Sequence, residues 1–383
     1  MRVTLNDASL ARYAGRFVWL DLNFDGPQNH RFLTSHGVAT TPSFYVLDPS
    51  DEHATATQLG AMTVPELTGF LDRGEQGVLA KAKTPADVAL AQGDALLASA
   101  QHAEAATAYD QALRAGGNNW TEHDRAVASF ARALLSSKQF ERCAGVVSTE
   151  APGMKRTAEF GRVLLLGMFC VNHDDKAPWS QTAATVLEPL AAEAIALPVT
   201  VRDHRYELYQ ALMTLADSRG DKATVKHWGD RWLNELDATK PVNDDERSAL
   251  DIARVDAASI LDEPSRVLPA LIASEKAMPT NYNSSLRLAQ MEVAARQNSQ
   301  AIAACDRGLQ HVNGPVGRSW LLQVKGDALM QAGRPGEAQR VLEEALHSAR
   351  EIGLEQTREN NIARVSEKIK EAQAAQKQAR GSL

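Results

Sequence analysis

Apolar residues recur at two different spacings along this chain, and the spacing changes near residue 80. Before that point, short apolar runs alternate with polar stretches that hold capping and turn residues, which indicates alternating helix and strand. The run Phe17–Leu22 is almost continuously apolar and rich in β-forming residues, so we predict a strand buried on both faces. A second strand is predicted at Ser43–Leu47, and a more polar edge strand at His53–Leu59.

Three helices are predicted around these strands. A short one ends at Tyr13, and a second begins at Pro27, whose fixed φ suits the first helical position, and ends at Gly37. The third begins at Thr63-Val64-Pro65-Glu66, which matches a capping box. In such a box the side chains of Thr63 and Glu66 each accept a hydrogen bond from the backbone N–H of the other residue. It is expected to stop at Gly74.

Beyond residue 80 the apolar positions follow the helical period and repeat at a longer interval. Residues 84–117 and 319–352 form the clearest copies, with small residues where two helices would touch and a large residue in the adjacent hole. The positions concerned are Gly93, Leu96, Ala105, Tyr109 and Ala112 in the first copy, and Gly326, Leu329, Gly333, Ala338, Leu342 and Ala345 in the second. This spacing resembles the tetratricopeptide repeat (TPR), and weaker copies lie between. The resemblance implies an α-solenoid of six or seven helix pairs.

The first part of the chain resembles the thioredoxin fold from the middle of its catalytic helix onward. The matching segments are Arg16-Phe17-Val18-Trp19-Leu20-Asp21, Ala39-Thr40-Thr41-Pro42-Ser43-Phe44-Tyr45-Val46-Leu47-Asp48, Gly60, and a final helix ending Phe70-Leu71. The resemblance implies a cis bond at Thr41–Pro42, at a position that borders the redox dithiol and the substrate groove in that family.

This chain departs from the thioredoxin pattern in two ways. It has no cysteine before Cys143, so the family's Cys-x-x-Cys is absent. The strand that precedes the catalytic helix, and that lies between the two matching strands in the family, is absent too. Three resolutions stay open: the gene starts upstream, another segment fills the gap, or the two flanking strands pair directly.

The predicted fold is therefore α+β and mostly α. It consists of an incomplete thioredoxin-like α/β domain at residues 1–76, a linker at 77–84, TPR-like helical repeats at 85–354, and a C-terminal capping helix with a frayed tail at 355–383.

Composition and charge narrow the function classes. The net charge is −7 and no dense Lys/Arg cluster occurs, so we predict no nucleic-acid partner. The longest apolar run, Val163–Val171, is too short for a membrane-spanning helix. The N-terminus has no apolar segment typical of a secretion signal. We therefore expect a cytoplasmic protein, or a periplasmic or secreted one if a signal sequence lies upstream of Met1.

Cysteines and metal ligands are sparse. Cys143, Cys170 and Cys305 are far apart in sequence, so we interpret them as small apolar core residues rather than as a disulfide scaffold. Asp21–Gly26 and His173–Asp175 each lack the ligands that would complete a cation site. No metal, cofactor or catalytic residue is predicted.

The candidate binding residues fall into two groups. Thr41 and Pro42 could present backbone groups to an extended peptide at a groove edge. The TPR resemblance implies a peptide or partner domain bound on the concave face of the array, by Asp87, Leu90 and Asp94 of the first clear copy and by Trp320, Gln323 and Asp327 of the last.

We therefore predict a bacterial-type protein–protein interaction protein whose thioredoxin-like part is redox-inactive. The alternative is a thiol–disulfide oxidoreductase whose Cys-x-x-Cys lies upstream of Met1.

Overall fold

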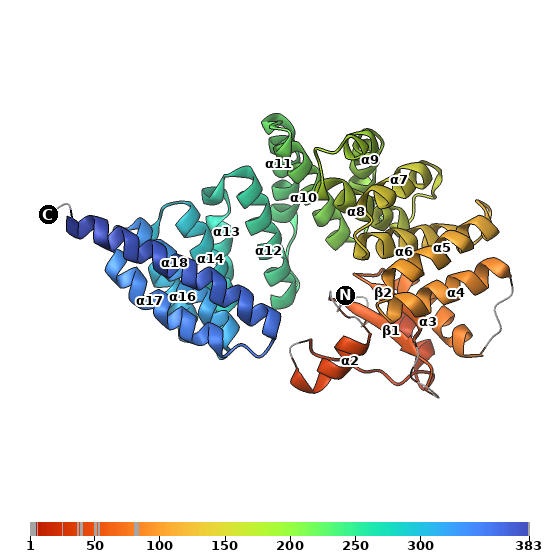
Figure 1. Cartoon of the computed structure of the whole chain (residues 1–383), viewed down its shortest axis with the longest axis horizontal. Coiled ribbons are helices and arrows are strands. Elements are labelled where there is room, and N and C mark those ends of the chain that lie inside the picture. The colour runs from red at the N-terminus through yellow and green to blue at the C-terminus, as the bar shows by residue number, and fades with distance from the viewer. Residues whose placement is uncertain are drawn as a thin grey trace. The chain divides into compact units, whose positions relative to one another are not determined.

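The computed structural model describes residues 5, 7–24, 26–36, 38, 41–49, 52, 54–79 and 84–381. It divides into two compact units, Met1–Gly220 and Asp221–Leu383, and Figure 1 labels the elements of both. This division differs from the predicted boundaries at residues 76 and 84, because the N-terminal residues and the first helix pairs belong to one unit.

Unit 1 begins with a small α/β body. Strands β1 (Ser43–Leu47) and β2 (Ala54–Leu59) pair antiparallel, and helix α3 (Val64–Leu79) packs against both. Three short helical segments precede them: η1 (Ala8–Tyr13), η2 (Pro27–Asn29) and α2 (His30–Ser35). The core of this body joins η1, both strands and α3, and its buried members are Leu10, Tyr13, Val46, Ala56, Met62, Leu67, Phe70 and Leu71.

The prediction of a buried strand at Phe17–Leu22 is wrong. The segment has no strand structure, and Val18 and Leu20 are 89% and 75% exposed. The ring of Phe17 still lies 5.9 Å from that of Tyr13, so the chain leaves the core just after this residue. A strand buried on both faces needs paired neighbours, and within the described residues the sheet contains β1 and β2 alone. The direct pairing of the two flanking strands is therefore not what the structure shows.

Other local predictions for this region are confirmed. The Thr41–Pro42 peptide bond is cis. The capping box of α3 is formed: the backbone N–H of Thr63 donates to Glu66 Oε2 at 2.7 Å, and that of Glu66 donates to Thr63 Oγ1 at 3.4 Å. The predicted stop at Gly74 is wrong, since α3 continues to Leu79. Gly74 is instead a contact residue, because a Cβ there would lie 2.5 Å from Val46.

Both units are built from antiparallel helix pairs with short connections, as the periodicity predicted. In unit 1 the helices are α4 (Pro85–Ala98), α5 (His102–Gly116), α6 (His123–Ser136), α7 (Phe140–Glu150), α8 (Ala158–His173), α9 (Pro178–Ala196) and α10 (Arg202–Ser218). In unit 2 they are α11 (Lys222–Ala238), α12 (Asp244–Leu261), α13 (Leu268–Ala277), α14 (Tyr282–Ala294), α15 (Asn298–Leu309), α16 (Pro315–Gln331), α17 (Pro335–Arg350) and α18 (Glu355–Gly381).

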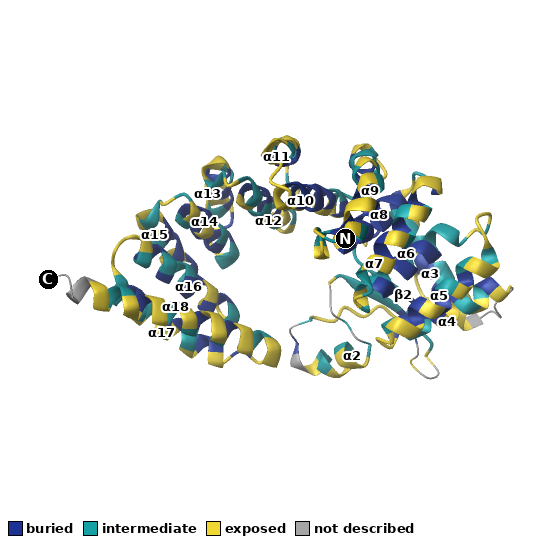
Figure 2. Cartoon of the chain, turned by 45° about the horizontal axis from the view of Figure 1, so that its top comes forward, coloured by how far each residue is buried: buried dark blue, intermediate teal, exposed yellow. Residues whose placement is uncertain are grey.

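The repeat residues pack as their spacing predicts. Ala105 and Ala338 are completely buried. A Cβ on Gly93 would lie 2.6 Å from the Tyr109 ring, and one on Gly326 would lie 2.6 Å from Leu342, so each glycine allows the two helices of its pair to approach closely. Successive pairs also stack, with α6 against α8 in unit 1 and α14 against α16 in unit 2. Buried residues accordingly line the contacting sides of these helices (Figure 2).

The interpretation of the cysteines needs correction. Cys143 on α7 and Cys170 on α8 form a disulfide, with Cα atoms 6.2 Å apart, whereas Cys305 is a free, buried thiol. The two half-cystines are 27 residues apart in sequence. Distance along the chain did not predict the pairing, because stacking of the α6/α7 pair on α8 brings the residues together.

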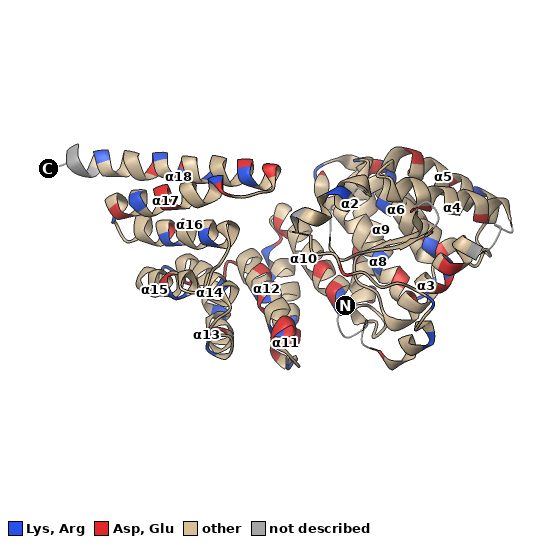
Figure 3. Ribbon diagram, turned by 90° about the horizontal axis from the view of Figure 1, so that it is seen from below, with Lys and Arg blue, Asp and Glu red and all other residues tan. Residues whose placement is uncertain are grey.

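The surface carries both signs of charge, and α18 alone shows Lys, Arg and Glu along its length (Figure 3). None of the described helices combines the length and the apolar character needed to cross a membrane.

Candidate functional site

Helices α4, α6 and α8 are the first helices of successive pairs in unit 1, and α10 packs on α8. We call the surface of these four helices the first-helix face. Strand β2 packs on α4, and residues of β2, α4, α6 and α8 together line a small cavity. This lining comprises Thr57, Gln58 and Leu59 from the strand and Leu97, Ala128, Ser129, Arg132, Glu159, Arg162 and Leu166 from the helices. The first-helix face of unit 1 is therefore the surface that receives the chain's own N-terminal body.

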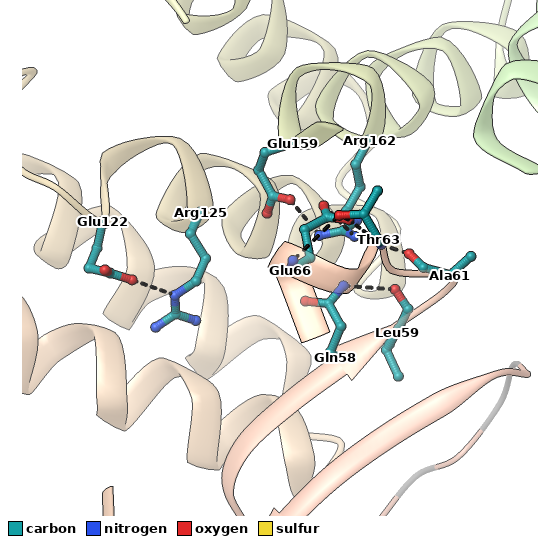
Figure 4. A network of polar contacts seen from close by, with 9 residues as sticks. All are labelled: Gln58, Leu59, Ala61, Thr63, Glu66, Glu122, Arg125, Glu159 and Arg162. Carbon is teal, nitrogen blue, oxygen red and sulfur yellow. Dashed lines mark hydrogen bonds and ion pairs between the residues drawn. The ribbon is translucent and has the colours of Figure 1, made fainter. Parts of the chain in front are cut away.

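Arg162 on α8 makes the central polar contact of this docking (Figure 4). The residue is 5% exposed. Its Nη2 donates to the main-chain carbonyl of Ala61 and to Glu66 Oε1, both at 3.1 Å, and its Nη1 pairs with Glu159. Glu66 uses its second oxygen to cap α3 at Thr63. One carboxylate therefore starts helix α3 and also fixes that helix to the array.

Burial around this contact disfavours the charged forms of side chains that have no partner. Burial raises the pKa of Glu159, which Arg162 partly opposes. Burial also lowers the pKa of His204 on α10 to about 3, with Arg162 and Arg132 adding to the shift, so this imidazole is neutral at physiological pH. Burial lowers the pKa of Arg73 on α3 as well, with a smaller contribution from nearby Arg125. Among these groups, Arg162 and Glu159 stabilise each other through their ion pair.

A second polar cluster connects α4, α5 and α6. Arg125 donates to both carboxylate oxygens of Asp94, at 3.0 and 3.2 Å, and the Tyr109 hydroxyl donates to Asp94 at 2.8 Å. Asp94 is 6% exposed, and burial together with this carboxylate raises the pKa of Tyr109 well above its ordinary value. Arg125 also pairs with Glu122. This cluster joins the first two helix pairs of the array.

The predicted binding residues of the first repeat occupy different environments. Leu90 is 3% exposed and belongs to the core, and Asp94 is engaged as described above. Asp87 accepts the N–H of Thr84 at the start of α4 and the indole N–H of Trp120 at 3.1 Å. All three therefore have structural contacts within unit 1.

The predicted residues of the last repeat lie together against α18. The Trp320 indole is partly exposed and donates to Asn361 at 3.1 Å, while buried Gln323 donates to Asn361 at 3.3 Å. Asp327 pairs with Lys368. The sequence reasoning missed Asn361 and Lys368, although the helical period of residues 355–370 identified the helix that carries them.

Thr41 and Pro42 lie at the start of β1. Thr41 is exposed, and the Pro42 carbonyl accepts the N–H of Gly60 at 2.8 Å, which closes the end of the two-stranded sheet. In the part of the chain that the structure describes, no group of three His, Cys, Asp or Glu side chains is arranged to hold a metal ion.

One buried carboxylate in unit 2 has few neighbours that stabilise its charged form. Glu292 on α14 is 5% exposed, and among the described residues its Oε2 has no hydrogen-bond partner. Burial raises its pKa to about 7, an effect that Arg307 opposes and Glu275 increases. The folded state therefore favours the protonated acid.

We expect unit 2 to lose stability as pH rises from about 4.5 towards 7 and beyond, because folding then forces Glu292 to ionise in a buried site. Glu292→Gln should remove this loss and stabilise the protein at pH 8 by up to about 3 kcal/mol, at about 1.4 kcal/mol per pKa unit. Denaturant unfolding between pH 4 and 8 measures the difference, with Glu371→Gln on the exposed side of α18 as the control. A constant difference between Glu292→Gln and the wild type over this range would contradict the expectation.

Comparison with known proteins gives limited similarity. No protein-family model matches the sequence, and a search among curated proteins finds no match. A tetratricopeptide repeat protein from Parabacteroides merdae aligns with 74% of this chain and 99% of its own length, at 8% identity and a TM-score of 0.45. The TPR2AB-domain:pHSP90 complex of yeast Sti1 aligns with 75% of this chain and 98% of its own, at 12% identity and a TM-score of 0.29.

Proposed function

We propose that this chain is a protein–protein interaction protein whose first-helix face binds polypeptide. The observation that carries the proposal is the contact of Arg162 with the Ala61 main-chain carbonyl and the Glu66 carboxylate. Every peptide ligand offers main-chain carbonyls, and an acidic peptide also offers side-chain carboxylates. The face of unit 1 thus already recognises a segment of protein by the chemistry that a partner would use.

The corresponding face of unit 2, formed by α12, α14 and α16, is the proposed site for a separate partner. Unit 2 by itself contains no strand among its described residues 221–381, so it supplies no hairpin like that of unit 1 to cover its own face. Gln290 on α14 stands directly after the repeat's small residue, as Asp94 does on α4, and it is exposed. The Trp320 indole of α16 donates its N–H to Asn361, but its ring is partly exposed. Gln290 and Trp320 therefore offer an amide and an aromatic surface, which suit a peptide or partner domain.

A peptide library displayed on phage and selected against the purified full chain tests this proposal. We expect binding of the selected peptides to fall at least about tenfold in the double variant Trp320→Ala/Gln290→Ala, as for loss of a central contact. Ile272→Ala provides the matched control, because Ile272 is 51% exposed on α13, the second helix of its pair. Peptides that lose affinity only with Ile272→Ala, or with neither variant, would contradict a site on the first-helix face.

We further propose that the repeats are tetratricopeptide repeats and that the first 76 residues are a partial thioredoxin-like domain. The repeat spacing and the close glycine contacts support the first point. The order of β1, β2 and α3 supports the second. The oxidoreductase alternative depends on a Cys-x-x-Cys that this sequence does not contain.

A further inference from the structure

We infer that Cys143 and Cys170 are oxidised to a permanent structural disulfide by a thiol–disulfide exchange catalyst, and that this chain therefore folds in an oxidising compartment. Folding in an oxidising compartment selects the periplasmic or secreted location from those that the sequence left open, whatever partner the chain binds.

The two half-cystines lie in a tightly packed interior. Both residues are completely buried, one on the second helix of a pair and one on the first helix of the next. Close by, a Cβ on Gly167 of α8 would lie 2.6 Å from Val147 of α7 and 3.0 Å from Leu187 of α9. Disulfide exchange requires a thiolate to approach a sulfur atom directly, and both half-cystines are completely buried in the folded chain. The disulfide is therefore inaccessible to other thiols once the helices have packed.

The third cysteine, Cys305, differs from the disulfide-bonded pair in being a free thiol. Cys305 on α15 is buried in unit 2, and burial raises the pKa of its thiol to about 12. A thiol that stays protonated is a poor nucleophile, so Cys305 is not expected to exchange with the Cys143–Cys170 pair or with an oxidant. In the folded chain Cys305 therefore stays a free thiol beside the Cys143–Cys170 disulfide.

The oxidation is a two-step exchange that conserves electrons. The thiolate of one cysteine attacks the disulfide of the catalyst, which forms a mixed disulfide and releases one catalyst thiol. The second thiolate then attacks the bound cysteine sulfur, forms the Cys143–Cys170 bond and releases the other catalyst thiol. Two electrons and two protons end on the catalyst dithiol. Such catalysts operate in oxidising compartments, whereas the cytosol keeps thiols reduced.

The test is to produce the full chain in a bacterium twice, once in the cytoplasm and once with an export signal to the periplasm. Each sample is denatured with N-ethylmaleimide and without reductant, and its mass is measured. We expect one adduct, on Cys305, in the exported chain and three in the cytoplasmic chain, whose melting temperature should be about 5–10 °C lower. Cys305→Ser should remove the single adduct of the exported chain and leave its disulfide intact.

Two further measurements keep the inference falsifiable if the reduced chain folds poorly. Dithiothreitol should reduce the exported chain only after denaturant is added, since the folded interior excludes the reductant. Three adducts in the exported chain would overturn the disulfide, and rapid reduction of the folded chain would overturn its permanence. One adduct in the cytoplasmic chain, at the same melting temperature as the exported chain, would overturn the requirement for an oxidising compartment.

Discussion

Replacing Arg162 by alanine should lower the free energy of unfolding of unit 1 by about 3–5 kcal/mol, the typical cost of removing one partner from a buried ion pair. Removing the guanidinium would leave its hydrogen-bond and ion-pair partners without a donor. Glu159 and Glu66 would lose their cation, and the Ala61 carbonyl would lose its donor, in a place where Arg162 itself is 5% exposed. Neither carboxylate could recover full hydration without separating β2 and α3 from the array.

Chemical denaturation of the full chain measures this loss, and amide exchange locates it. We expect faster exchange along β2 and at the start of α3, since Arg162 bonds to Ala61 between them and to Glu66 in the first turn of α3. Arg219→Ala is the matched control: it removes an arginine paired with Glu188, but both side chains are more than a third exposed, so its effect should stay within about 1 kcal/mol. Equal losses in the two variants would show that the Arg162 contact does not anchor the N-terminal body.

Local chemistry predicted the elements that depend on few neighbours. The predicted capping box at Thr63–Glu66 forms, because its two partners are three residues apart and need only a helix start. The contacts of the small residues in the repeats could also be predicted from the sequence. Gly93 and Ala105 lie at contacts within a single helix pair, and the repeat period alone predicts which positions make such contacts.

Features that depend on distant segments were not predictable from local pattern. An apolar run such as Phe17–Leu22 indicates a buried strand only if other strands pair with it, and the sequence of the run itself does not reveal its neighbours. The Cys143–Cys170 pairing required knowing which helices stack. The contact of Arg162 with Ala61 joins residues 101 positions apart, so no spacing rule applies to it.

The binding residues predicted in the two clear repeats illustrate a further limit. Asp94 and Asp327 each follow the small residue of their repeat by one position, so the sequence assigned both the same role. The structure distinguishes them. Asp94 is buried and bonded to Arg125 and Tyr109, whereas Asp327 pairs with Lys368 at a site where the carboxylate is 37% exposed. Equivalent repeat positions therefore differ in burial, which depends on what covers each helix.

This difference predicts that Asp94→Ala will be far more destabilising than Asp327→Ala. Loss of Asp94 leaves the Arg125 charge and the Tyr109 hydroxyl without their shared acceptor in the interior, which should cost about 3–5 kcal/mol. Loss of Asp327 frees a lysine that can reach water, so the cost should be within about 1 kcal/mol.

Urea unfolding of the two variants, measured under identical conditions, gives the comparison. Adding Arg125→Leu to Asp94→Ala should restore much of the lost stability, because it removes the unpaired charge itself. Similar losses for the two aspartates, or no recovery in the double variant, would mean that the Asp94–Arg125 pair does not join the first two helix pairs as the geometry indicates.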